Sequence, residues 1–123
     1  MEGVARVHDL PRLAPVAEGK VALECKGQKV TYRELSENIG KWAAFLRGQG
    51  VVPGDRVVIC MPNCFEFIYS YLGASMTGAM VVPLNLMLTP EEILFVLFDC
   101  RPRVVLVHPA IAARLELSAL TGA

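Results

Sequence analysis

The sequence predicts an α/β protein with a doubly wound, mainly parallel sheet and flanking helices, and three observations support this fold class. Short β-branched runs alternate with longer amphipathic or apolar segments. The longer segments begin near residues that favour a helix start, and they end close to glycine or proline. Strands and helices that alternate in this way form crossover units, and such units build parallel sheets with helices on both faces.

The clearest crossover unit follows Gly78. Glycine at this position can adopt the left-handed conformation that closes a helix. Val81 and Val82 suit a short strand that is covered on both faces, and Pro83 cannot donate a hydrogen bond to a neighbouring strand. This segment therefore predicts a helix end, a buried strand and a loop in direct succession.

Two segments carry the sequence pattern of a helix start. Thr31 and Glu34 form a Thr-x-x-Glu capping box, and Thr89 and Glu92 form a second one with Pro90 at the first helical position. In such a box the threonine side chain and the glutamate side chain each accept a backbone N–H of the first turn. We expect a helix to begin directly after each threonine.

The remaining elements follow from hydrophobic periodicity and turn residues. In chain order, the sequence predicts strands at 21–25 and 29–31 around a turn at 26–28, a helix from 32 to the glycines at 48 and 50, a strand at 56–61, a largely buried helix that opens at 62–64 and contains residues 65–76, a helix at about 90–99, and a strand at 104–107.

The expected organisation is one scaffold with two short ends. We expect an N-terminal arm at residues 1–19, the strand-and-helix scaffold at 20–109, and a truncated helix or tail at 110–123. The chain shows no internal repeat, low-complexity segment or interdomain linker.

The composition indicates more apolar surface than the chain can hide. Of its 123 residues, 54% are apolar, whereas a chain of this size buries roughly two-thirds of its unfolded surface. We expect an open sheet edge and partly uncovered helices. The missing cover would be a partner chain or the remainder of a larger protein.

A membrane span is the competing explanation for the apolar composition. No charged residue occurs between Glu66 and Glu91, an interval long enough to cross a bilayer. Gly73, Gly78 and Pro83 interrupt it, which favours separate elements of a globular domain. The N-terminus does not resemble a secretory signal, and we expect a cytoplasmic protein with peripheral membrane contact as an open alternative.

Charge and cysteine content exclude several classes of protein. Twelve basic residues balance twelve acidic ones, and no basic stripe appears, so a nucleic-acid partner is not expected. Cys25, Cys60, Cys64 and Cys100 form no Cys-x-x-Cys pair, which favours free thiols in a reducing cytosol over a disulfide or metal site. Cys60 and Cys64 flank a strand-to-helix turn, which leaves a redox role as the alternative.

The polar candidates for a site are few. His108 follows the last strand, and ligands of open parallel sheets bind beyond the carboxyl ends of the strands. The competing interpretation is an exposed loop histidine without a catalytic partner. Asn63 and Asn85 also follow strands, where asparagine commonly caps helices or holds turns. His8 lies in the N-terminal arm.

The sequence lacks both standard phosphate-loop fingerprints. Neither Gly-x-Gly-x-x-Gly nor Gly-x-x-x-x-Gly-Lys-Ser/Thr occurs. Pro62 removes a backbone donor from the turn after the strand at 56–61, and Glu34 and Glu66 are expected in first helical turns, where they favour the helix dipole. A dinucleotide-binding domain is therefore not favoured.

Five segments in order resemble the N-terminal region of the adenylate-forming acyl-CoA synthetases, over roughly residues 20–108. They are residues 30–35 (VTYREL), 50–57 (GVVPGDRV), Pro62-Asn63 with Glu66, 78–85 (GAMVVPLN) and 88–92 (LTPEE). These motifs are most similar to those of the fatty-acid and related acid:CoA ligases. Aryl-acid ligases and peptide-synthetase adenylation domains have a similar N-terminal region.

The resemblance implies a two-step reaction in a complete enzyme. A carboxylate attacks the α-phosphate of ATP with Mg²⁺, which gives an acyl-adenylate and pyrophosphate, and the thiol of coenzyme A then displaces AMP. The groups that perform these steps in the family follow this region, so the resemblance assigns no catalytic, cofactor-binding or metal residue to this chain. It implies that the 123-residue chain alone is an inactive N-terminal fragment. The alternative is a complete small protein that uses the scaffold for assembly, as an oligomer or with another chain.

Overall fold

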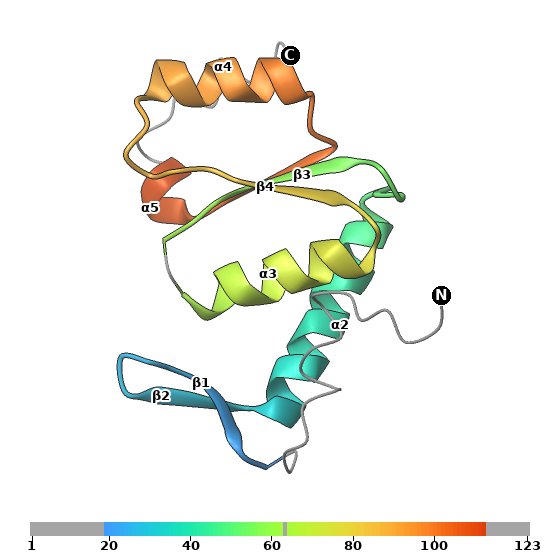
Figure 1. Ribbon diagram of the computed structural model, residues 1–123, viewed down its shortest axis with the longest axis vertical. Coiled ribbons are helices and arrows are strands. Elements are labelled where there is room, and N and C mark those ends of the chain that lie inside the picture. The colour runs from blue at the N-terminus through green and yellow to red at the C-terminus, as the bar shows by residue number, and fades with distance from the viewer. Residues whose placement is uncertain (1–18, 63, 113–123) are drawn as a thin grey trace, which may run out of the picture.

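The computed structural model describes residues 19–62 and 64–112. The expected elements are present at the expected places (Figure 1). They are β1 (Val21–Cys25), β2 (Gln28–Thr31), α2 (Tyr32–Gly48), β3 (Arg56–Cys60), α3 (Phe65–Met76), β4 (Met80–Pro83), α4 (Pro90–Cys100), β5 (Val104–Val107) and α5 (Pro109–Ala112). Residues 1–18 of the predicted arm and residues 113–123 of the predicted tail lie outside the described residues.

The strands form two separate sheets. β1 and β2 pair as an antiparallel hairpin, and β4, β3 and β5 form a parallel sheet in that order. In Figure 1 α3 lies on one face of the parallel sheet and α4 on the other, while the hairpin lies beside the N-terminal end of α2. The α/β class and the doubly wound arrangement are confirmed.

The core is built on the central strand β3. Val57, Val58 and Ile59 are fully buried. Side chains alternate along a strand, so Val57 and Ile59 pack with residues of α2 and α3, whereas Val58 packs on the other face with residues of α4 and α5. Burial on both faces explains why this strand is a continuous apolar run.

The expectation that β4 is covered on both faces is confirmed only in part. Val81 packs against the cluster on the α2 and α3 side of the sheet, and Val82 packs against the cluster on the α4 side. Val81 and Val82 are only half-buried, and Met80 is 58% exposed. β4 lies at an edge of the sheet and has β3 as its one neighbour among the described strands. Strand order decides this exposure, and the residues of β4 do not reveal strand order.

Helices α2 and α3 pack closely against each other at Gly73. A Cβ at this position would lie 2.8 Å from Trp42 Cβ and 3.1 Å from the carbonyl oxygen of Ile39. The hairpin joins this pair, because Val30 of β2 packs in one cluster with Leu35 of α2 and Tyr69 of α3. The missing side chain at Gly73 therefore sets how near the two helices approach.

Both predicted capping boxes are confirmed. Thr31 Oγ1 accepts the Glu34 N–H at 3.2 Å, and Glu34 Oε1 accepts the Thr31 N–H at 3.0 Å. The second box has the same pair of bonds at 3.2 and 3.1 Å, between Thr89 and Glu92. Each box fixes the point at which a strand or loop turns into a helix.

Helix α4 ends at an unusual residue. Arg101 adopts the left-handed conformation, with φ of 47°, and its N–H donates to the carbonyl oxygen of Leu97 at 3.0 Å. A residue with a Cβ costs about 1–2 kcal/mol in this region, and glycine avoids that cost. The sequence predicted the end of α4 here from Pro102 and gave no sign of the left-handed arginine.

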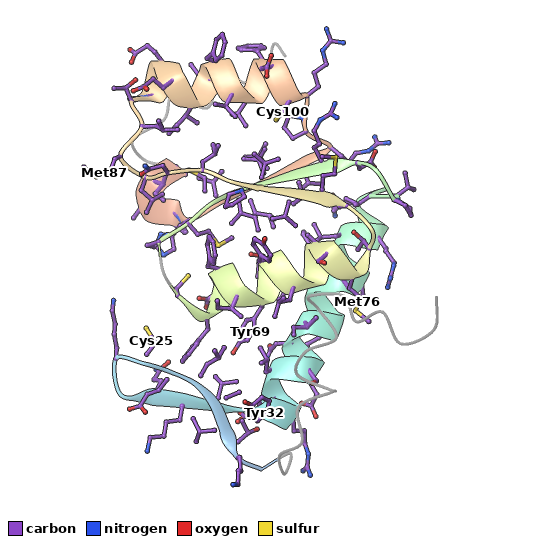
Figure 2. All side chains as sticks on the ribbon, in the orientation of Figure 1. Cys25, Tyr32, Tyr69, Met76, Met87 and Cys100 are labelled. Atoms are coloured by element: carbon purple, nitrogen blue, oxygen red, sulfur yellow. The ribbon has the colours of Figure 1, made fainter. Side chains whose placement is uncertain are left out.

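The expected excess of exposed apolar surface is present around α4. Phe95 is 72% exposed and Phe98 is 54% exposed. Met87, in the loop before α4, is also exposed and lies at the margin of the molecule in Figure 2. None of the helices in the described ranges combines the length and the apolar composition that a bilayer crossing requires.

Candidate functional site

The carboxyl edge of the parallel sheet is the expected place for a ligand. There the chain leaves β3 at Cys60, β4 at Pro83 and β5 at Val107. Two backbone bonds tie these ends together, because Leu84 N–H donates to the Ile59 carbonyl at 2.9 Å and His108 N–H donates to the Cys60 carbonyl at 3.1 Å. The edge is therefore held in place by backbone bonds to the central strand.

His108 is the single residue that connects β5 to the short helix α5. Its Nδ1 accepts the Ala110 N–H at 3.1 Å, and its carbonyl oxygen accepts the N–H groups of Ile111 and Ala112. The side chain is half-buried rather than fully exposed. The imidazole thus caps α5, and the side chain is less exposed than the interpretation as a solvent-exposed loop histidine expected.

Asn85 stabilises the loop after β4. Its Oδ1 accepts the Met87 N–H at 2.8 Å, which is the hydrogen bond of an Asx turn. The predicted turn role is confirmed for this residue. Asn63 and His8 lie outside the described residues.

The four cysteines are free thiols, as expected. Cys60 is buried in β3, whereas Cys25, Cys64 and Cys100 are half-buried. Burial raises the pKa of the Cys64 thiol, and the nearby Glu66 carboxylate raises it further, so the thiolate is disfavoured at neutral pH. A raised pKa argues against a nucleophilic or redox role for Cys64.

An apolar groove separates the hairpin from the start of α3. It encloses about 270 Å³, and Cys25 of β1, Cys64 and Ile68 are among its lining residues. Figure 2 shows Cys25 on the side of the hairpin that faces α3.

No group of three or more His, Cys, Asp or Glu side chains within the described ranges is placed to hold a metal ion.

The opposite edge of the sheet carries a polar pocket that sequence reasoning missed. It encloses about 310 Å³ at the amino ends of β3 and β5. Its lining residues are Gly54, Asp55, Arg56, Arg101, Pro102 and Arg103. The Arg101-Pro-Arg103 sequence was a detectable signal, although only the fold shows that Arg56 lies beside it.

The described residues do not offer a phosphate cradle at the carboxyl edge. Pro62 supplies no N–H to the loop between β3 and α3, and α3 begins without a side-chain cap bond. Glu66 and Glu91 each place a carboxylate in the first turn of α3 or α4, the helices that follow β3 and β4. A carboxylate at that end of a helix occupies the position that an anion would favour, and it repels phosphate.

Comparison with known proteins identifies this part of the fold. The profile of the family described as "AMP-binding enzyme" matches residues 11–121. The chain is 38% identical over 92 residues to the 3-hydroxybenzoate/4-hydroxybenzoate CoA ligase of Thauera aromatica, and 34% identical over 87 residues to the long-chain-fatty-acid CoA ligase of Bacillus subtilis. These alignments cover 71% of this chain in each case, but only 18% and 16% of the two relatives.

The fold agrees with the sequence comparison. The structure of the anthranilate CoA ligase AuaEII in complex with anthranoyl-AMP superposes with a TM-score of 0.84 at 30% identity, over 94% of this chain and 22% of that protein. The chain thus spans under a fifth of the curated relatives it matches, and its elements correspond to the N-terminal part of adenylate-forming enzymes. The chain belongs to the AMP-binding enzyme family.

Proposed function

We propose that this chain is the N-terminal part of an ATP-dependent acid:CoA ligase. One observation carries the proposal. The family profile and the fold match nearly the whole of this chain, whereas the matched region is only a small share of each relative. The matched motifs fall on the capping boxes, on the turn glycines and on the buried strand β3, which are scaffold positions. In this proposal the chain supports the reaction of a larger protein.

The proposed reaction needs ATP, Mg²⁺ and coenzyme A in the complete enzyme. The residues described here do not fit an ATP site, because the strand-to-helix turns lack a donor cradle and carry carboxylates. The contribution of this chain is positional. Buried β3 and the two capped helices hold the sheet edge on which further residues of the enzyme would rest.

A fatty acid is the substrate class that we propose for the complete enzyme. The fatty-acid CoA ligase among the relatives supports it, and the hydroxybenzoate ligase makes aromatic acids the competing class. A panel of both acids is therefore part of the test.

The decisive experiment compares two proteins in an acid-dependent ATP–pyrophosphate exchange assay. The purified 123-residue chain is expected to give no exchange above background with any acid. The native protein that carries this sequence, captured with an antibody to the chain, is expected to have a several-fold larger intact mass and to support exchange with fatty acids. Exchange by the chain alone would show that the inactive-fragment proposal is wrong. Exchange by the native protein with benzoates only would show that its substrate class is aromatic acids and not fatty acids.

A second candidate function follows from the exposed apolar side chains around α4. Phe95 and Phe98 form a surface that a stand-alone assembly module would cover with another copy or another chain. A native mass equal to that of the chain, together with concentration-dependent oligomers in sedimentation, would favour this candidate. Flotation of the chain with liposomes would instead favour peripheral membrane contact.

A further inference from the structure

The polar pocket at the amino ends of β3 and β5 has the composition of an anion site. Its walls bring Arg56 of β3 beside Arg101 and Arg103, which flank the turn between α4 and β5. The one acidic residue in the lining is Asp55. The pocket lies at the sheet edge opposite the one where the carboxyl ends of the strands meet, so it is separate from the candidate site described above.

The charges in this pocket do not cancel. Arg103 Nε lies 3.4 Å from Asp55 Oδ2, and the same carboxylate oxygen accepts the Val52 N–H at 2.9 Å. The Val52 N–H, with a smaller contribution from Arg103, lowers the pKa of Asp55, so the carboxylate is ionised at neutral pH. One carboxylate against three guanidinium groups leaves an excess of positive charge.

The arginine side chains keep donors for a ligand. Arg56 uses its Nε to donate to the carbonyl oxygen of Cys100, which fixes its guanidinium against the end of α4. Each guanidinium carries five N–H groups, so one bond of this kind leaves most of them available. The Arg101 side chain makes no hydrogen bond or ion pair with any residue that the structure describes, although it lines the pocket.

The backbone conformation of Arg101 indicates that its side chain is not needed for the helix cap. The residue closes α4 in the left-handed conformation, where glycine or asparagine fits with less strain. An arginine at this position contributes nothing to the cap that glycine would not, because the cap bond comes from the backbone N–H to Leu97. Its side chain is what distinguishes it, and that side chain lines the pocket.

We propose that this arginine pocket binds the phosphate group of a small anionic ligand. Guanidinium forks match phosphate oxygens in bidentate geometry, and a phosphate with two negative charges complements the excess positive charge. The volume of about 310 Å³ leaves space for one or two phosphoryl groups. The proposal does not depend on ligase activity, because it concerns binding to the chain without acid or ATP.

The test measures binding of pyrophosphate to the purified 123-residue chain at low ionic strength by calorimetry. The Arg101→Gly variant is expected to lose about tenfold in affinity, the size of one charge-assisted hydrogen bond. Its melting temperature is expected to stay the same or rise, because glycine relieves the left-handed strain. Loss of affinity with retained or raised stability separates ligand binding from a structural role of Arg101.

A matched control removes one positive charge elsewhere. Lys41 is exposed on α2 and does not line the pocket, so Lys41→Gln is expected to bind pyrophosphate like the parent chain. Arg101→Asn provides a second variant whose side chain tolerates the left-handed conformation. Equal effects of Arg101→Gly and Lys41→Gln would show general electrostatic attraction and would overturn the proposal.

A second arm distinguishes a soluble phosphate from a lipid headgroup. Binding to vesicles that contain phosphatidic acid, without binding of pyrophosphate, would place the phosphate in a lipid, provided that Arg101→Gly again weakens it. Absence of binding in both arms would overturn the proposal. Pyrophosphate binding and vesicle binding by the chain are both independent of ATP–pyrophosphate exchange by the complete enzyme. A negative result for the arginine pocket is therefore distinguishable from a negative result for the proposed ligase function.

Discussion

Single atoms decide how closely two helices of this protein approach. At Gly73 of α3 a methyl group would meet Trp42 Cβ at 2.8 Å and backbone atoms of Ala43 and Ile39 at 3.1 Å. Real Cβ atoms do not approach that closely, so α2 or α3 would have to move. The absence of a side chain at this residue is therefore a packing requirement.

Gly73→Ala is expected to destabilise the chain by about 1–3 kcal/mol, the usual cost of overpacking a close contact. Gly40→Ala is the matched control, because Gly40 lies in α2 with no atom within 4 Å of the added Cβ. Alanine there is expected to stabilise by about 0.5–1 kcal/mol through helix propensity. Urea unfolding measures the change in the free energy of unfolding for both variants, and we expect the two changes to have opposite signs. Changes of the same sign would contradict the packing argument.

Asp55 contributes stability that depends on pH. Its pKa is lowered in the folded protein, first by the Val52 N–H and then by Arg103. A carboxyl with a lowered folded pKa contributes stability above its unfolded pKa of about 3.9, and this stability is lost as the pH falls through the folded value. The contribution is thus fully present at neutral pH.

The variant Asp55→Asn is expected to be less stable than the parent at pH 7 and to approach it in strongly acidic solution. Asp99→Asn serves as a control for charge removal, because Asp99 is exposed near the end of α4. Unfolding curves at several pH values measure the difference. A difference between parent and Asp55→Asn that stays constant down to strongly acidic pH would contradict the assignment.

At the scale of elements, local signals predicted every helix and strand except α5 to within one or two residues. Capping boxes gave the starts of α2 and α4, and Gly78, with its φ of 83°, marked the turn after α3. These signals are local because they depend on hydrogen bonds between residues three apart. The boundaries could therefore be predicted without knowledge of the fold.

Properties that depend on neighbours in space could not be predicted in the same way. The exposure of β4 depends on strand order, and the capping role of His108 depends on the short helix that follows it. The arginine pocket joins residues 44 positions apart, since Arg56 Nε contacts the carbonyl of Cys100. The sequence thus indicated the family scaffold but not the surfaces that the scaffold presents.

The second capping box offers a prediction about α4. Thr89→Ala removes the acceptor of the Glu92 N–H, and such a change costs about 1 kcal/mol in other helices. Ser36→Ala in α2 is a suitable control, because it removes a hydroxyl from a helix without touching a cap. Thermal unfolding measures both, and a Thr89→Ala variant as stable as Ser36→Ala would show that the box contributes little.

At the scale of the whole molecule, substitutions on the exposed apolar face of α4 are expected to affect association but not folding stability. Phe95→Ser with Phe98→Ser is expected to change the free energy of unfolding by no more than about 0.5 kcal/mol per residue, because both side chains are exposed. The same pair is expected to reduce self-association or contact with the remainder of a ligase. Leu97, at 7% exposure, faces the core, and Leu97→Ala is expected to cost about 2–5 kcal/mol.

Sedimentation velocity and urea unfolding of these variants check both halves of the prediction. Lower association with unchanged stability would identify the α4 surface as an interface. A double variant that associates as strongly as the parent would place the interface elsewhere, for example at the half-buried edge strand β4.

The central position of β3 has a consequence for biosynthesis. Both of its partner strands, β4 and β5, follow it in the chain, so the ribosome releases the most deeply buried strand before either neighbour exists. At about 5–20 residues per second, that apolar segment waits some seconds for its second neighbour. During this interval the nascent chain presents Val57, Val58 and Ile59 to solvent or to a chaperone, and translational pausing after β3 would lengthen the exposure.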